Sequence, residues 1–180
     1  NNRMPFCSRI LKASRLQKFY RDGDVIIFGI GKEEPERANR IIGVYQMVAV
    51  KTGKWPYLKF PLIEEEITKE QIDKFLFNAG IEPPVLYKLG FSHNNCSGGC
   101  VRAGKKQWKL LYDKLPEVYL DRERVEREFA WRFRKRATIF KDESLEEFRG
   151  RIERGELSSY YNTQNKEKDT ECVGICNSRA

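Results

Sequence analysis

Apolar and basic positions alternate at helical spacing near the start of the chain. Between Ser8 and Arg21, four large apolar residues alternate with lysine and arginine at roughly helical spacing; they are Ile10, Leu11, Leu16 and Phe19. This pattern predicts an amphipathic helix with a basic outer face, stopped by Gly23. The run VIIFGI at 25–30 is unbroken and apolar. Such a run is typical of a strand covered on both faces, as in a parallel sheet.

A strand-and-helix pattern continues after this run. Pro35 suits a first helical position, and residues 36–42 have the composition of a helix that follows a strand. The sequence KFPLI at 59–63 indicates a second strand, with Pro61 at its start or at a sheet edge. Because sheets usually hold about four to six strands, we expect a missing segment or another chain to supply the rest.

Helices dominate the second half of the chain. Thr68 with Gln71 forms a capping box, in which a hydroxyl accepts from the amide three residues later and that residue's side chain reaches back. Ser144 with Glu147 forms another. The predicted helices span 68–79, 108–115, 122–136 and 144–155. The polar stretch 158–170 is expected to be loose and to deliver the last two cysteines.

Composition favours one soluble domain. Of the 180 residues, 40% are apolar and 33% are charged, and the formal net charge is +8. Helices around a small parallel sheet place this domain in the α/β class. No stretch approaches the roughly 18 apolar residues of a membrane span, so we expect a cytoplasmic protein without a membrane partner. The positive surplus suits a nucleotide, a polynucleotide or an acidic protein, or serves solubility alone.

Four of the five cysteines form two Cys-x-x-x-Cys pairs. Cys96 pairs with Cys100 in this pattern, and Cys172 with Cys176. An odd number of cysteines without a secretion signal argues against a disulfide framework. Paired thiolates from distant segments can hold tetrahedral zinc or an iron–sulfur cluster. The alternative is a set of isolated buried or surface thiols.

Short motifs give the chain a resemblance to the C-terminal half of the phosphoadenosine phosphosulfate (PAPS) reductase family. In the family's order, they are PFCSRILK at 5–12, FGI at 28–30, Glu34-x-x-Arg37-x-x-Arg40 and PLI at 61–63. The block LYKLGFSHNNCSGGCV at 86–101, followed by Gln107-Trp108 and Pro116-Glu117, is similar to family members from phages and mobile elements.

The resemblance implies an adenine nucleotide α-hydrolase-like fold. We expect the C-terminal part of that fold in 1–120, a helical extension in 121–157 and a cysteine-bearing tail in 158–180. Family members grip phosphates near their N-terminus with a loop of the pattern Ser-Gly-Gly-Lys-Asp-Ser, which this chain lacks. Either an N-terminal half or partner chain completes the fold, or the protein has lost that site, and we favour the first.

A nucleotide site is also implied by the resemblance. Arg37 and Arg40 match basic positions that face ATP or PAPS in the family. Three residues apart on a helix, they share a face from which two guanidiniums can clamp phosphate or sulfate oxygens. Lys12, from a basic pair near the start, is expected at the same cofactor site. The alternative for the arginines is surface ion pairing with Glu33, Glu34 or Glu36.

The cysteines match family positions only in part. Cys7 corresponds to the family's first cysteine site, and Cys96 with Cys100 corresponds to its closing pair. Cluster-bearing members carry two adjacent cysteines at the first site and a closing spacer one residue shorter. Cys172 and Cys176 are therefore the expected additional ligands of a zinc or iron–sulfur site.

Cys172 has a rival role. Glu171-Cys172 followed by Gly174-Ile175 resembles the tail in which PAPS reductases keep the catalytic thiol that attacks the sulfonate sulfur. A valine intervenes here, and Cys176 stands where the family has histidine. We therefore rank metal ligation ahead of catalysis for Cys172.

The histidine, the tryptophans and the basic helix are less specific. We interpret His93 as a hydrogen-bonding residue rather than a catalytic one; the alternatives are a ligand or a phosphate contact. We interpret the tryptophans as packing residues rather than base-stacking platforms; they are Trp55, Trp108 and Trp131. The arginines of 122–136, with the lysines at 105, 106 and 109, can form a nucleic-acid face, whereas interleaved glutamates favour an ion-paired, solvated helix.

The leading functional hypothesis is an adenine-nucleotide-dependent sulfur-metabolism enzyme of the PAPS reductase family. Its reaction would be sulfonucleotide reduction or ATP-driven sulfur transfer. The alternative is a non-catalytic, metal-stabilised binding subunit that contacts nucleic acid or a protein partner.

Overall fold

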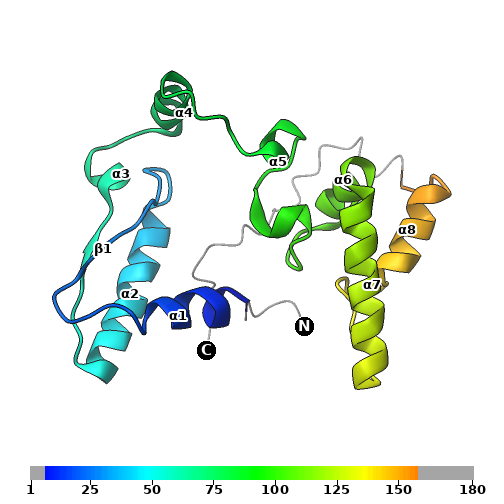
Figure 1. Cartoon of the computed structure of the whole chain (residues 1–180), viewed down its shortest axis with the longest axis horizontal. Helices are drawn as coiled ribbons and strands as arrows, with labels where there is room; N and C mark the ends of the chain where they lie inside the picture. The colour runs from blue at the N-terminus through cyan, green and yellow to red at the C-terminus, as the bar shows by residue number, and fades with distance from the viewer. Residues whose placement is uncertain (1–6, 158–180) are drawn as a thin grey trace. The chain divides into compact units, whose positions relative to one another are not determined.

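The computed structural model describes residues 7–157, which form two compact units that meet in sequence at Pro83 and Pro84 (Figure 1). We call residues 7–83 the N-terminal unit and residues 84–157 the C-terminal unit. The described chain is mixed α/β and mostly helical, with a small two-stranded parallel sheet flanked by helices. The α/β class predicted from the sequence is confirmed at this level.

The sheet lies in the N-terminal unit. β1 (Val25–Ile27) pairs in parallel with β2 (Tyr57–Lys59), so that Ile26 lies opposite Leu58. The side chains of Val25 and Ile27 are exposed. The expectation of a strand covered on both faces is therefore wrong, because within the described residues only one face of this narrow sheet has a covering layer.

One long helix covers the sheet and connects its strands. α2 (Pro35–Thr52) begins with the predicted proline and extends well beyond the predicted residue 42. Its buried positions follow helical spacing and meet Phe28 and Phe60, whose rings stack with centroids 5.3 Å apart. The core of this unit consists of Tyr20, Ile30, Ala38, Ile41, Tyr45 and Phe60.

Pro61 begins a helix rather than a strand. The strand predicted at 59–63 is displaced, since β2 ends at Lys59 and α3 (Pro61–Glu64) follows directly. Proline lacks a backbone N–H and therefore fits the first helical turn, where that donor has no intrahelical partner. The Glu64 carboxylate accepts a hydrogen bond from the Phe60 backbone N–H at 2.9 Å, which satisfies another donor of this turn.

The first helical segment is shorter than predicted. A π-helical segment, η1 (Ser8–Ala13), runs into α1 (Ser14–Leu16), and the helix ends well before Arg21. Leu11 and Leu16 are exposed. The predicted apolar face is thus not buried against the described part of the chain.

Both capping boxes are confirmed. Before α4 (Lys69–Asn78), the Thr68 hydroxyl accepts from the Gln71 N–H at 3.3 Å, and the Gln71 side chain accepts from the Thr68 N–H at 2.7 Å. Before α8 (Leu145–Glu153), Ser144 and Glu147 make the same pair of bonds at 3.1 and 2.7 Å. These helix starts depend on neighbouring residues only, which is why the sequence predicts them well.

Helices build the described C-terminal unit. In chain order they are α5 (Val85–Lys88), the short 3₁₀ turn η2 (Asn95–Gly98), α6 (Lys105–Lys114), α7 (Pro116–Phe133) and α8. Trp108, Tyr119 and Phe148 are fully buried in its core. The Tyr119 hydroxyl donates to the Leu145 carbonyl at 2.7 Å and so links α7 to α8.

Candidate functional site

A left-handed turn of the C-terminal unit begins at Cys96 and ends at Gly98, two residues before Cys100. Three successive residues of η2 have positive φ, namely Cys96 at 53°, Ser97 at 54° and Gly98 at 85°. A residue with a Cβ pays roughly 1–2 kcal/mol for this conformation. Such a turn persists only where the surrounding residues stabilise it. We call residues 93–100 the cysteine turn.

Packing around Gly98 holds the turn in place. A Cβ added there would lie 2.8 Å from Phe91 Cε1 and 3.0 Å from Leu111 Cδ1. The Gly98 carbonyl also accepts a hydrogen bond from Gln107 Nε2 at 2.7 Å. Only glycine therefore fits at position 98. The hydrogen bond from Gln107 of α6 fixes the orientation of the Gly98 carbonyl between the two cysteines.

Several buried polar atoms in and near the cysteine turn have no hydrogen-bond partner among the described residues. They are His93 Nδ1, Gln107 Oε1 and Arg122 Nε. Arg122 borders the turn, because a Cβ on Gly99 would lie 3.3 Å from its Nε. Buried polar atoms are normally paired, so these surroundings fit a bound polar or charged group.

The two thiols of the turn differ in accessibility. Cys96 is exposed, whereas Cys100 is buried in the hydrophobic core of the C-terminal unit. Thiolates suit zinc and iron–sulfur clusters, but either group normally takes four protein ligands. Within residues 7–157, no three cysteine, histidine or acidic side chains come together as a metal site. The cysteine turn thus contributes at most half of a thiolate site.

The other predicted ligands are elsewhere. Cys7 is exposed and belongs to the N-terminal unit. Cys172 and Cys176 lie outside the described residues, as does the predicted tail at 158–180. Convergence of the cysteines on one site therefore stays a prediction, as does a catalytic role for Cys172.

The predicted nucleotide-binding residues lie in the N-terminal unit. The Arg37 guanidinium donates to both Glu34 carboxylate oxygens, at 2.9 and 3.1 Å, and its side chain is half-buried. This is the ion pair that the sequence offered as the alternative for Arg37. Arg40, one turn further along α2, is exposed, and so is Lys12 in η1. A phosphate at Arg37 would have to compete with the carboxylate already bound there.

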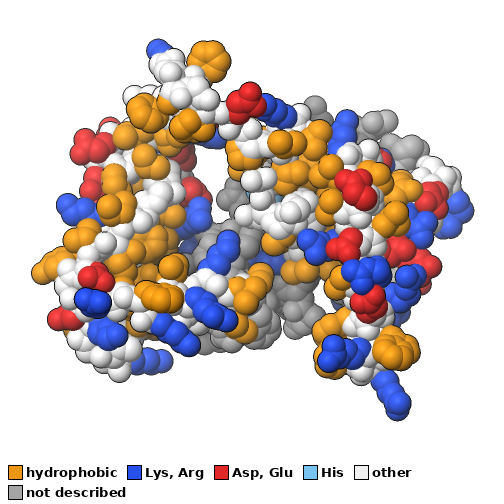
Figure 2. Space-filling view, in the orientation of Figure 1, with side chains coloured by type: hydrophobic (Ala, Val, Ile, Leu, Met, Phe, Trp, Pro, Cys, Tyr) orange, Lys and Arg blue, Asp and Glu red, His pale blue; other side chains and the backbone are white. Residues whose placement is uncertain are grey.

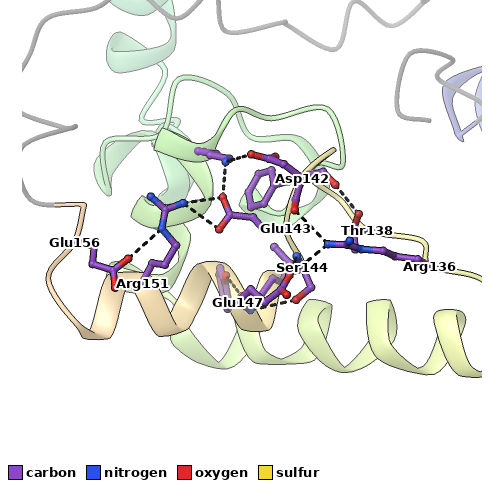
Figure 3. Close-up of polar contacts among 12 residues, drawn as sticks. Arg136, Thr138, Asp142, Glu143, Ser144, Glu147, Arg151 and Glu156 are labelled. Carbon is purple, nitrogen blue, oxygen red and sulfur yellow. Dashed lines mark hydrogen bonds and ion pairs between the residues drawn. The ribbon is translucent and has the colours of Figure 1, made fainter.

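A polar network centred on a buried carboxylate joins three parts of the C-terminal unit (Figure 3). Glu143 accepts from Lys105 of α6 and, at 3.0 and 3.1 Å, from Arg151 of α8. Lys105 also donates to Asp142 at 3.1 Å and lies over the Phe140 ring. Because cations already occupy both Glu143 oxygens, this network anchors the segment before α8 rather than offering a reactive group.

Carboxylates in the C-terminal unit make it sensitive to acid. The hydrogen bond from Lys105 lowers the pKa of Asp142 below its ordinary value. Hydrogen bonds also lower the pKa values of Glu147, Glu153 and Glu156, donated chiefly by the Ser144 backbone, Tyr112 and Arg154. A lowered folded-state pKa stabilises the fold above the unfolded value near 4, and this stabilisation is lost as pH falls through the folded value.

We therefore expect the melting temperature of the chain to fall between pH 5 and pH 3. Thermal unfolding followed by circular dichroism checks this result. The variant Lys105→Met removes the donor that lowers the Asp142 pKa, so its melting temperature should depend less on pH over the same range. A melting temperature that stays constant or rises on acidification would contradict the assignment.

Helix α7 carries both ion pairs and exposed rings. Arg124 pairs with Asp121 at 2.7 Å and with Glu128 at 2.6 Å, as the ion-paired interpretation of this helix predicts. Trp131, near the C-terminal end of α7, is 83% exposed. The packing interpretation is therefore wrong for Trp131 and also for the exposed Trp55, although it is right for Trp108.

Helical phase is the signal that could have revealed Trp131. The buried positions of α7 are Tyr119, Glu123 and Glu126. At about 100° per residue, position 131 points away from that stripe. Exposure of this ring follows from the spacing once the buried stripe is known.

Comparison with protein-family models, curated proteins and solved structures finds no match to this chain. None of the helices within residues 7–157 combines the length and apolar character needed to cross a membrane.

Proposed function

We propose that this chain is part of an adenine-nucleotide-dependent sulfur-metabolism enzyme of the PAPS reductase family, with a zinc ion or iron–sulfur cluster bound through Cys96 and Cys100. The observation that supports this most is the cysteine turn, in which packing around Gly98 fixes a left-handed backbone between Cys96 and Cys100. The Asn-Asn-Cys block that carries the family resemblance is this same turn.

The remaining roles follow the motifs. Cys172 and Cys176 would complete the thiolate set, with Cys7 as a further candidate. Arg37, Arg40 and Lys12 would contact the nucleotide, ATP or PAPS. Sulfonucleotide reduction and ATP-driven sulfur transfer both fit this arrangement, and Cys172 is the candidate nucleophile if the reaction is reduction.

Metal content tests the proposal directly. The chain purified without oxygen should contain zinc or iron, measured by mass spectrometry of the elements, and iron in a cluster should give visible absorption. Cys96→Ser and Cys100→Ser should each lose most of the metal, since a thiolate site rarely tolerates loss of a ligand. Cys7→Ser is the informative comparison, because retention of the metal would exclude Cys7 as a required ligand. Wild-type chain without bound metal would contradict the site.

Nucleotide affinity tests the arginines. Arg40→Ala should weaken binding of ATP or PAPS about tenfold or more, because a charge-assisted hydrogen bond contributes roughly 1.5–3 kcal/mol. Glu34→Gln should strengthen binding, because it releases the Arg37 guanidinium from its carboxylate partner. Isothermal titration calorimetry measures both effects. Lys51 is exposed on the same helix, so Lys51→Ala is the control. An unchanged affinity in Arg40→Ala would exclude Arg40 from the nucleotide site.

A second candidate function is a metal-stabilised binding subunit without catalysis. The ion pair between Arg37 and Glu34 favours it, because a guanidinium already paired with a carboxylate is a weaker phosphate ligand. Bound metal together with undetectable nucleotide binding would support this candidate over the enzyme.

A further inference from the structure

Three aromatic side chains stand exposed near the C-terminal end of α7. Phe129 is 49% exposed, Trp131 83% and Phe133 58%. This end of α7, yellow-green in Figure 1, continues past α8, and Figure 2 shows hydrophobic and basic side chains together on it. Large aromatic side chains are usually buried. Three exposed rings on one protruding helix end therefore indicate a binding surface.

Cations surround these rings. We call the region the α7 tip and define it by its rings Phe129, Trp131 and Phe133 and its cations Arg127, Arg132, Arg134, Lys135 and Arg136. Between residues 127 and 136, Glu128 is the only acidic residue, and its carboxylate accepts a hydrogen bond from Arg124. Among the cations, Arg136 alone pairs with a carboxylate of the described chain, that of Glu147 at 3.7 Å. The tip is therefore strongly positive.

We propose that the α7 tip binds single-stranded nucleic acid. Proteins that bind single strands combine aromatic side chains, on which bases stack, with cations that follow the phosphates. The α7 tip has aromatic side chains and cations within one stretch of chain, and its positive charge complements the negatively charged phosphates of a nucleic acid. This inference uses neither the metal site nor the nucleotide site, so it can hold or fail independently of the proposed function.

The placement of the rings favours a single nucleic-acid strand over a lipid surface. Phe129 and Phe133 lie one helical turn apart, with ring centroids separated by 4.4 Å. Trp131 lies two residues from each and therefore on the opposite side of the helix. Binding in a membrane interface requires one continuous apolar face, which this arrangement lacks. A flexible nucleic-acid strand, by contrast, can pass around a protruding helix, so that its bases stack on rings on both sides.

Fluorescence anisotropy with the full chain tests the inference. The probe is a fluorescein-labelled oligo(dT) of about 20 nucleotides, titrated at several salt concentrations. Trp131→Ala should weaken binding about tenfold, the usual effect of losing one stacked base. Arg132→Gln/Arg134→Gln/Lys135→Gln should reduce the slope of log K against log salt by about 2, since each phosphate contact on a single strand contributes about 0.7.

Matched variants separate the α7 tip from general attraction. Trp55→Ala removes an exposed tryptophan of the N-terminal unit, and Lys51→Gln/Lys54→Gln/Lys69→Gln removes three exposed charges there. Both should bind oligo(dT) like the wild type. An equal loss in these controls would overturn the proposal. So would binding to anionic vesicles without binding to oligo(dT), or self-association that Trp131→Ala abolishes in a chain that does not bind the oligonucleotide.

Discussion

Gly98→Ala is expected to destabilise the C-terminal unit by about 3 kcal/mol. Two costs add at this position. A left-handed φ of 85° costs a residue with a Cβ roughly 1–2 kcal/mol, and the new methyl group would lie 2.8 Å from Phe91 Cε1, an overlap that typically costs about 1–3 kcal/mol. Chemical denaturation, followed by the fluorescence of buried Trp108 in a Trp55→Phe/Trp131→Phe background, measures the change.

Gly90→Ala is the matched control for Gly98→Ala. Gly90 also has a positive φ, 91°, but a Cβ added there meets nothing within 4 Å. Its substitution should therefore cost only the roughly 1–2 kcal/mol of backbone strain. Equal losses in the two variants would show that Phe91 and Leu111 yield easily and that packing does not hold the cysteine turn. If the turn binds metal, Gly98→Ala should also lower the metal content more than Gly90→Ala does.

Local features were predictable from the sequence because their partners are neighbours in the chain. The capping boxes at Thr68 and Ser144 each need only a residue three positions away, and Pro35 begins its helix as expected. Pro61 shows where this reasoning stops. A proline suits both a strand start and a first helical turn, and the neighbouring residues did not decide between them.

Exposure in the sheet could not be predicted, because it depends on residues distant in sequence. The apolar run at 25–30 looks like a doubly covered strand, yet Val25 and Ile27 are exposed in a narrow sheet. Trp131 resembles a packing residue until the buried stripe of α7 is known. The cysteine turn was found by its motif, but the left-handed backbone at Cys96 and the packing under Gly98 have no signature beyond the glycines themselves.

Glu126→Ala is expected to cost the C-terminal unit about 2–5 kcal/mol. The buried Glu126 carboxylate accepts from the Ile139 N–H at 2.5 Å and from the Leu145 N–H at 2.7 Å, and so holds the segment between α7 and α8. Alanine removes the acceptor of both hydrogen bonds, and losing an acceptor in this way costs about 1–3 kcal/mol for each bond. Glu128→Ala, an exposed site on the same helix, should change stability by less than about 0.5 kcal/mol.

The pH dependence of this loss distinguishes Glu126 from the surface carboxylates. Burial raises the pKa of Glu126 above its ordinary value, against the opposing effect of its two backbone hydrogen bonds. A raised folded-state pKa gives stability that is complete below the unfolded value near 4.5 and is lost as pH rises through the folded value. The difference between wild type and Glu126→Ala should therefore be larger at pH 4 than at pH 8, opposite in sign to the Asp142 effect. A difference that grows towards alkaline pH would mean that Glu126 is stabilised as the anion, and that its hydrogen bonds outweigh its burial.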